Sequence, residues 1–275
     1  MARPTLMSRR RALARLLLAG VTGLAALTLV ACAGPSTPSA NGARSPHSST
    51  PNTSRPRPSR SATPFPVPTP TFDKTAHSVD DPSSIWLVVN KPRAIVPARY
   101  EPADLVYPDV VNINHQPMRQ ETATALLALF AAGKAEAGLN FSVQSAYRPF
   151  DSQKSIYDSD VASHGVGWAD NYTARPGHSE HQTGLAVDIS AVPAKCSLDP
   201  CFAETPHAQW LKANAWRFGF LLRYPADKVD MTGYSFEPWH FRYIGVPLAT
   251  EMHNTEVSTL EEFFGVKGGT TYVTP

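Results

Sequence analysis

Acidic residues are absent from the first 72 positions of the chain, although this stretch holds nine arginines. The remaining positions carry 16 Lys and Arg against 23 Asp and Glu, a formal charge of −7, so the +2 of the whole chain hides two parts of opposite sign. The acidic part also lacks any cluster of basic side chains interleaved with aromatic ones, the pattern typical of nucleic-acid binding. We therefore expect no nucleic-acid partner.

A hydrophobic run long enough to span a membrane comfortably is also lacking. The longest apolar run covers residues 16–31, which is 16 positions, whereas a transmembrane helix needs roughly 20. Arginines precede it, and a basic segment followed by a short apolar run is typical of a secretory signal. The run ends in Leu-Val-Ala before Cys32, which resembles a bacterial lipobox and implies cleavage before Cys32 and a diacylglycerol on its sulfur. An uncleaved anchor helix or an ordinary signal peptide is the alternative, and the start Ser8-Arg9-Arg10 also permits twin-arginine export.

Large apolar side chains are nearly absent from residues 33–71, which hold ten of the 26 prolines. Such a composition cannot bury enough apolar surface to offset the conformational entropy lost on folding. We predict an extended tether that holds the following domain away from the membrane; a proline-rich docking ligand is the alternative. The predicted organisation is a signal peptide over residues 1–31, a lipidated cysteine and tether over 32–72, and a folded domain over 73–275.

Cysteine is scarce in that domain, where only Cys196 and Cys201 occur. In an exported protein a pair at this spacing most simply forms a disulfide that closes a small loop. A structural zinc site would need a second cysteine pair, which the sequence does not have.

Helical and extended patterns alternate along the domain without an internal repeat. Apolar residues three and four positions apart predict helices over residues 118–139 and 206–218, and residues 260–264 are expected to form a short closing helix. The Gly-rich and polar stretch over residues 163–176 predicts a long loop and a candidate lid.

Strands are predicted over residues 141–146 and 220–224, with a polar connection over residues 228–234 before the next strand. This order of elements predicts an α+β fold with a mostly antiparallel sheet, one face of which carries a metal.

The densest set of reactive side chains lies in residues 174–190. Alternation after Gly184 predicts a strand with one apolar face, so Asp188 lies on the opposite face. His181 precedes this strand, and a second segment offers Glu237 and His240. Two histidines and one aspartate form a three-ligand set that leaves a position open for water, as catalytic zinc requires, with Glu237 as the general base. Taken singly, each of these residues is more simply a hydrogen-bonded structural residue.

The spacing of Glu237 and His240 raises a geometric question. In an extended strand, residues three apart point to opposite faces. Either Pro238 bends the chain or Glu237 lies just before the strand; the sequence leaves both open. His178, three residues before His181, is a competing candidate ligand.

The runs SEHQTGLAVD and EPWHFRYIG, with SAYRP upstream, resemble the zinc D-alanyl-D-alanine carboxypeptidases of the vancomycin-resistance type, relatives of the hedgehog and lysostaphin-like zinc folds. The resemblance covers roughly residues 85–264. It implies one zinc ion on His181, Asp188 and His240, with Glu237 as the catalytic base. It also implies that Arg148 acts in catalysis and substrate binding, where its fork binds an anionic oxygen, and that Gln153 and Ser179 contact substrate.

The activity implied is removal of the terminal D-alanine from a peptidoglycan stem peptide by a D,D-carboxypeptidase anchored outside the cytoplasm by the lipid on Cys32. Three alternatives remain open at this point. The same residues also suit an L,D-carboxypeptidase acting on the tetrapeptide stem, or an endopeptidase that cleaves cross-bridges. A non-catalytic zinc-bearing wall-binding module is the third, and its mark would be loss of the base or of a ligand.

Overall fold

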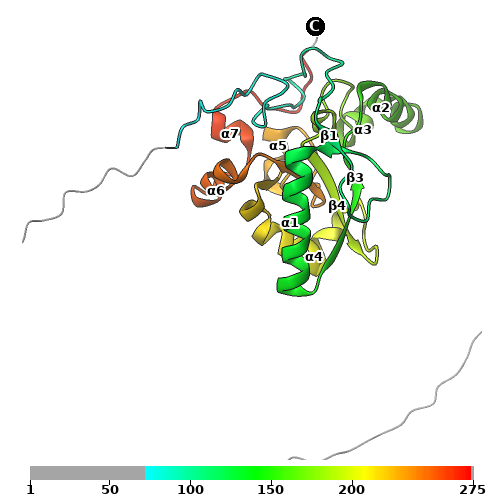
Figure 1. The fold of residues 1–275 in the computed structure, drawn as a ribbon. Helices are drawn as coiled ribbons and strands as arrows, with labels where there is room; N and C mark the ends of the chain where they lie inside the picture. The colour runs from blue at the N-terminus through cyan, green and yellow to red at the C-terminus, as the bar shows by residue number, and fades with distance from the viewer. Residues whose placement is uncertain (1–71, 274–275) are drawn as a thin grey trace, which may run out of the picture. The chain divides into compact units, whose positions relative to one another are not determined.

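The computed structural model describes residues 72–273, which form an α+β fold around one main sheet (Figure 1). The predictions of a signal peptide, a lipidated Cys32 and a tether lie outside the described residues. Within residues 72–273, no helix combines the length and the apolarity needed to cross a membrane.

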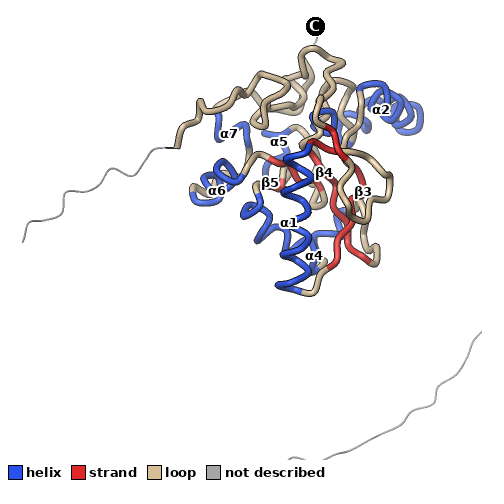
Figure 2. Tube along the Cα trace, viewed as in Figure 1, coloured by secondary structure: helices blue, strands red, loops and turns tan. Residues whose placement is uncertain are grey.

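The main sheet has four strands in the order β3-β4-β6-β5, and every pair of neighbours is antiparallel, as the sequence predicted (Figure 2). The strands are β3 (Asn140–Ser145), β4 (Ala186–Val192), β5 (Phe220–Leu222) and β6 (His240–Tyr243). A separate two-stranded sheet pairs β1 (Leu105–Val106) with β2 (Met118–Arg119). The helices are α1 (Gln120–Ala137), α2 (Phe150–His164), α3 (Val166–Tyr172), α4 (Pro206–Asn214), α5 (Val229–Thr232), α6 (Val246–Asn254) and α7 (Leu260–Phe264). Short 3-10 helices are η1 (Glu180–Thr183), η2 (Pro200–Glu204), η3 (Ala215–Phe218) and η4 (Ala226–Lys228).

Strand β4 has the two faces that its alternating sequence predicted. Val187 and Ile189 belong to the main hydrophobic core together with Leu126 and Leu129 of α1. Asp188, between the two apolar residues, lies on the opposite face because successive side chains of a strand alternate. The packing of α1 on one face therefore leaves the other face for polar side chains.

Helix α1 begins two residues later than predicted, because Met118 and Arg119 pair with β1 before the helix starts. It ends at Gly138, whose φ of 68° is the left-handed conformation that commonly terminates helices. The predicted helix over residues 206–218 is present as α4 followed by the 3-10 helix η3.

The predicted long loop over residues 163–176 is wrong, since α2 runs to His164 and α3 occupies Val166–Tyr172. Gln153 is the one buried residue of α2 and Ala169 the one buried residue of α3. Helices that bury so little have no apolar stripe, and the periodicity that reveals an amphipathic helix is missing from their sequences. For the same reason the supposed polar connection over residues 228–234 concealed the single turn of α5.

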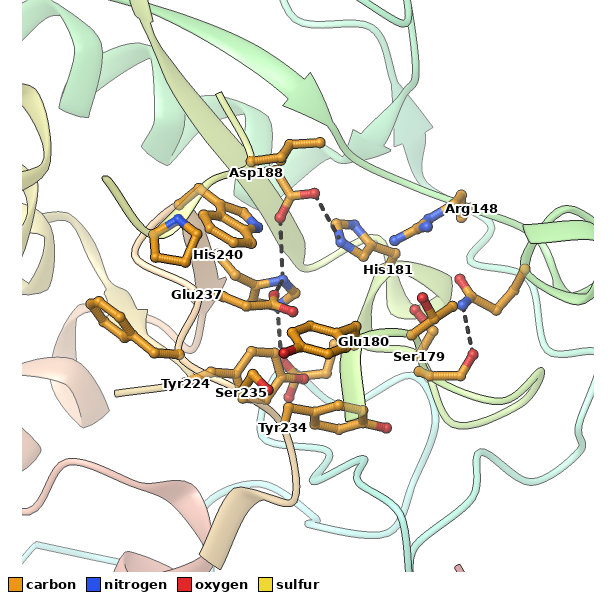
Figure 3. Close-up of a pocket in the computed structure, with 18 of the residues that line it drawn as sticks. Arg148, Ser179, Glu180, His181, Asp188, Tyr224, Tyr234, Ser235, Glu237 and His240 are labelled. Carbon is orange, nitrogen blue, oxygen red and sulfur yellow. Dashed lines mark hydrogen bonds and ion pairs between the residues drawn. The ribbon is translucent and has the colours of Figure 1, made fainter. Parts of the chain in front are cut away.

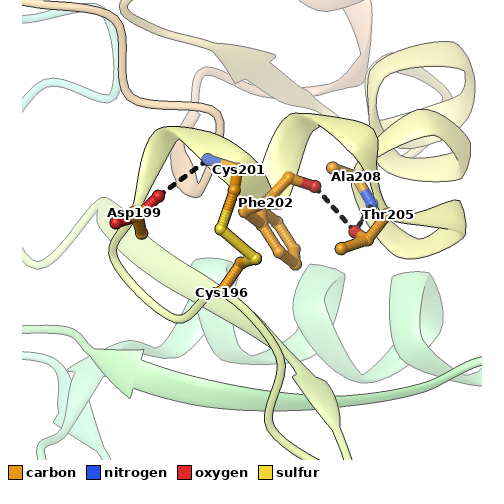
Figure 4. Close-up of a disulfide and its surroundings, with 6 residues drawn as sticks. All are labelled: Cys196, Asp199, Cys201, Phe202, Thr205 and Ala208. Carbon is orange, nitrogen blue, oxygen red and sulfur yellow. Dashed lines mark hydrogen bonds between the residues drawn. A yellow bond between two sulfur atoms is a disulfide. The ribbon is translucent and has the colours of Figure 1, made fainter.

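The predicted disulfide between Cys196 and Cys201 is present and closes a tight loop before α4 (Figure 4). Asp199 accepts a hydrogen bond from the Cys201 backbone N–H at 2.9 Å and so begins η2. Thr205 in turn accepts one from the Ala208 N–H at 3.1 Å and caps α4. The loop is thus fixed at both ends by covalent and capping interactions.

A glycine turn joins η1 to β4. Gly184 has a φ of 66°, and a Cβ built there would lie 2.9 Å from Cγ and 3.3 Å from the backbone N of Arg119. Arg119 cannot retreat easily, because its Nε donates to Asp104 at 2.9 Å and its backbone N–H to the Gly184 carbonyl at 3.0 Å. Only glycine fits here, since the turn needs both the left-handed conformation and the missing side chain.

We expect Gly184→Ala to lower the free energy of unfolding by more than Gly138→Ala does. Both glycines have left-handed φ angles, but a Cβ at Gly138 would meet nothing within 4 Å. Gly138→Ala should therefore lower the free energy of unfolding only by the cost of a left-handed alanine, about 1–2 kcal/mol. Gly184→Ala should lower it by about 1–3 kcal/mol more, because the added Cβ overpacks the turn. Urea denaturation of both variants measures the difference, and equal losses would contradict the packing argument.

Candidate active site

The pairing of β4 with β6 brings the first two candidate metal ligands together. Asp188 lies directly opposite His240 in the antiparallel register, so both side chains leave the same face of the sheet a few ångströms apart. His181 joins them from η1, immediately before β4 (Figure 3). One ligand atom from each of the three residues lies within 4.8 Å of the others, and all three residues are buried. This is the one such cluster found within residues 72–273.

The hydrogen bonds of His181 decide which of its nitrogens faces the cluster. Its Nδ1 lies 2.8 Å from the Ala146 carbonyl, which can only accept a hydrogen bond. Nδ1 therefore carries the proton, and Nε2, 3.3 Å from Asp188 Oδ2, presents a lone pair. A backbone carbonyl that fixes the tautomer in this way is a common outer partner of metal-binding histidines.

Asp188 and His240 complete a donor set that fits zinc. Asp188 Oδ1 lies 3.2 Å from His240 Nδ1, yet it is buried without a hydrogen-bond partner. A buried carboxylate oxygen left without a hydrogen bond is costly, and a cation between the three side chains would satisfy it. Two imidazole nitrogens and one carboxylate oxygen form a familiar catalytic zinc set with an open fourth position.

The charges within the cluster also favour a bound cation. Burial alone would raise the pKa of Asp188, but the neighbouring His181 and His240 hold it well below its usual range. Burial lowers the pKa of His181. For His240 the effect of burial is outweighed by the carboxylates of Asp188 and Glu180, which raise its pKa to about 9. A bound cation would supply that positive charge instead and leave both imidazoles neutral.

Glu237 lies before strand β6, which answers the question that its spacing raised. The His240 N–H donates to the Glu237 carbonyl at 3.2 Å, so residues 237–240 form a turn through Pro238. The turn brings Glu237 Oε2 to 3.5 Å from His240 Nδ1, on the same side as the other ligands. Burial raises the pKa of Glu237 to about 7, an effect that the neighbouring Asp188 reinforces. A carboxylate poised near neutrality suits a general base.

A cavity of about 600 Å³ opens over the cluster, and Arg148, Gln153 and Ser179 line it. Arg148 follows β3 and forms no ion pair within the described part of the chain, and burial lowers its pKa. Gln153 donates from Nε2 to the Ala174 carbonyl at 2.7 Å, while its buried Oε1 has no partner. Among the described residues, the cavity therefore contains a guanidinium that forms no ion pair and an amide oxygen without a hydrogen-bond partner, both beside the metal ligands.

A family model for D-alanyl-D-alanine carboxypeptidases (VanY) matches residues 115–246. The relative YodJ of Bacillus subtilis (strain 168), provisionally named a carboxypeptidase, is 42% identical over 68% of this chain and 69% of its own. A D-alanyl-D-alanine carboxypeptidase of Enterococcus faecalis (strain ATCC 700802 / V583) is 34% identical over 70% of each chain. The chain belongs to the VanY family.

Solved structures agree with this assignment. The LD-carboxypeptidase LdcB superposes with a TM-score of 0.62 at 42% identity, over 68% of this chain and 88% of that one. A vancomycin-resistance D,D-pentapeptidase VanY, from a VanB-type cassette and solved with Zn(II), gives a TM-score of 0.53 at 34% identity, over 64% of this chain and 97% of that one. Family membership and the His/Asp/His cluster together make this protein a zinc metallopeptidase with a single zinc site.

His178, the competing ligand, lies outside the cluster of this VanY-family chain. Its Nδ1 is 3.0 Å from the Asn90 carbonyl, and its ring packs edge-on against Tyr272. His164 also lies outside the cluster and packs on Trp168 at the start of α3. The structure therefore favours His181 over His178.

Several residues of the site were missed by the sequence analysis. Glu180 is buried beside His240, and burial, which would raise its pKa, is outweighed by Arg223 and Arg242, which hold that pKa well below its usual range. Tyr224 packs against His240, with ring centres 4.7 Å apart. The only sequence feature that could have pointed to Glu180 is its place between Ser179 and His181. Its arginine partners lie 43 and 62 residues away along the chain, so no local pattern reveals them.

The mouth of the cavity was foreseen only in part, because residues 163–176 were predicted to be a candidate lid but as a loop, and Leu198 was not expected there. Trp168 and Tyr172 of α3 and Leu198 of the disulfide loop line it, and their side chains are partly exposed. Both elements lie over the zinc site only because of tertiary packing, and neither carries a recognisable sequence motif.

We expect His178→Asn to retain close to one zinc ion per chain and His181→Asn to retain almost none. His178 contacts a backbone carbonyl, which asparagine can also reach, whereas His181 supplies one of three ligand atoms. Metal analysis by mass spectrometry after dialysis measures both, with circular dichroism as the control for folding. Loss of zinc from the His178 variant alone would reverse the assignment.

Proposed function

We propose that this protein is a D,D-carboxypeptidase that removes the terminal D-alanine from peptidoglycan stem peptides. The observation that carries the carboxypeptidase assignment is Arg148, a guanidinium that forms no ion pair with any described residue and lines the same cavity as Glu237 and the zinc ligands. The D,D preference is supported by the matching family model, which describes D-alanyl-D-alanine carboxypeptidases. A fixed cation suits the free carboxylate at the end of a peptide, which it can bind through two hydrogen bonds. A substrate cut by an endopeptidase continues past the cleaved bond and offers no free terminal carboxylate for this guanidinium.

The residues divide the reaction between them. His181, Asp188 and His240 would hold the zinc ion, which would supply Lewis-acid chemistry by polarising a carbonyl and lowering the pKa of a water molecule toward about 7. Glu237 takes a proton from the attacking water and gives it to the nitrogen of the departing D-alanine. Arg148 orients the substrate by its terminal carboxylate, while the partnerless Oε1 of Gln153 is available to accept a hydrogen bond from the peptide.

An L,D-carboxypeptidase acting on the tetrapeptide stem is the second candidate. It is favoured by one observation: LdcB, named an LD-carboxypeptidase, shares 42% identity with this chain, more than the D,D-pentapeptidase VanY at 34%. The same base, arginine and zinc ligands would serve either reaction.

Defined stem peptides separate the two activities. We expect the soluble domain to release one alanine from the pentapeptide, with activity abolished by a chelator and restored by zinc, as measured by mass spectrometry. Cleavage of the tetrapeptide alone would assign the L,D activity. If neither were cleaved by zinc-loaded protein, the carboxypeptidase proposal would fail.

Glu237→Gln is the matched control for this assay. It keeps the size of the side chain and leaves the three zinc ligands intact, so zinc should stay bound. Loss of the general base should lower kcat by at least about 100-fold. Undiminished hydrolysis would mean that another residue is the base.

The cellular location is also a proposal. It is supported by the basic segment at the start of the chain, by the apolar run over residues 16–31, and by Cys32 directly after that run. We expect Cys32 to be lipidated and to hold the enzyme on the outer side of the bacterial cell membrane. Cys32→Ser should then move the protein from the membrane fraction to the soluble fraction and abolish incorporation of a labelled fatty acid. Membrane retention without the cysteine would support an uncleaved anchor.

A further inference from the structure

Each ring nitrogen of His240 faces a carboxylate. Nδ1 points toward the zinc cluster, 3.2 Å from Asp188 Oδ1 and 3.5 Å from Glu237 Oε2. Nε2 points away from it and lies 3.4 Å from Glu180 Oε2 (Figure 3). We propose that Glu180 is a positioning residue that holds the proton of His240 on Nε2 and so keeps Nδ1 free to bind zinc.

The carboxylate of Glu180 has one oxygen reserved for this contact. Its Oε1 accepts from Arg223 Nε and from Arg242 Nη1, both at 2.9 Å. Its Oε2 faces His240 Nε2. Because two guanidinium groups hold one oxygen, the other is directed at the imidazole and can accept a hydrogen bond from its N–H.

The arginines are themselves held on several sides. Arg242 donates from Nη2 to the carbonyls of Leu87 and Ile85, at 2.9 and 3.1 Å. Arg223 forms two hydrogen bonds with the carboxylate of Glu261 in α7, at 2.7 and 2.9 Å. Both guanidinium groups and both glutamates are fully buried. Residues 85–87 and α7 thus hold the two arginines that bind Glu180. The carboxylate of Glu180 therefore cannot easily turn away from His240.

The two zinc histidines are therefore fixed by different acceptors. His181 donates its outer proton to the neutral carbonyl of Ala146, and His240 donates its own to an ionised carboxylate. A carboxylate makes the imidazole a stronger base and so a stronger metal ligand. Glu180 would contribute to zinc affinity without touching the metal.

A purely structural role is the rival explanation, since Glu180 also balances the charge of two buried arginines. Glu261 provides the matched control. It belongs to the same buried network and pairs with the same Arg223, but it makes no contact with His240. Glu180→Gln and Glu261→Gln each remove one negative charge from this network, so both should lower stability, and only the first should change the zinc site.

We expect Glu180→Gln to weaken zinc binding by about 10–100-fold, measured by competition with a chromophoric chelator. Glu261→Gln should bind zinc nearly as tightly as the unmodified protein while unfolding at lower urea concentration. Unchanged affinity in the Glu180 variant, or an equal loss in both variants, would overturn the proposal. Glu180→Asp retains the charge and serves if the glutamine variant does not fold: its shorter side chain cannot reach both Arg242 and His240, so zinc affinity should again fall.

A spectrum of the unmodified protein tests the same idea without any substitution. Long-range proton–nitrogen NMR correlations distinguish the two ring nitrogens of each histidine. In the zinc-loaded protein the His240 proton should reside on Nε2 and that of His181 on Nδ1. A proton on Nδ1 of His240 would show that Glu180 does not set the tautomer.

Discussion

The register of β4 against β6 is the constraint on which the zinc site depends. Asp188 lies directly opposite His240, so the two ligands share one face of the sheet and approach to 3.2 Å. A shift of β6 by one residue would turn His240 toward the hydrophobic core, while Asp188 of β4 would keep its face. Val187, Ile189 and Phe241 hold the register from the opposite face, where they pack in the core with α1. The packing that stabilises the fold therefore also sets the geometry of the metal centre.

Buried charge is arranged in two adjoining sets around His240. Glu180 and Glu261 are matched by Arg223 and Arg242, so this set is neutral and fully hydrogen-bonded. The other set, with Asp188 at its centre, is rich in lone pairs and retains an oxygen without a partner. Unbalanced charge is costly to bury, and a divalent cation would balance the negative charge of the second set and bind its free oxygen. His240 links the two sets, with one nitrogen in each.

Some parts of the site were readable from the sequence because they are local. The alternation around Asp188 predicted its face, and the cysteine pair predicted its disulfide. The fold class and the zinc cofactor also followed from the sequence patterns and the family resemblance. Helices α2 and α3 were missed because Gln153 and Ala169 are their only buried residues, and a helix without an apolar stripe leaves no period to detect.

The sequence by itself determined the residue types of the zinc site, their order along the chain and the strand that carries Asp188. The family resemblance already implied His181 rather than His178, and the geometry agrees with it. Only the tertiary structure decided that Glu237 turns toward the cluster before β6 and that Glu180 lies behind His240. These outcomes depend on strand register, on a turn and on pairing across 43 to 62 residues. Spacing along a chain fixes which side chains share a local face, but contacts between distant segments are fixed only when the core packs.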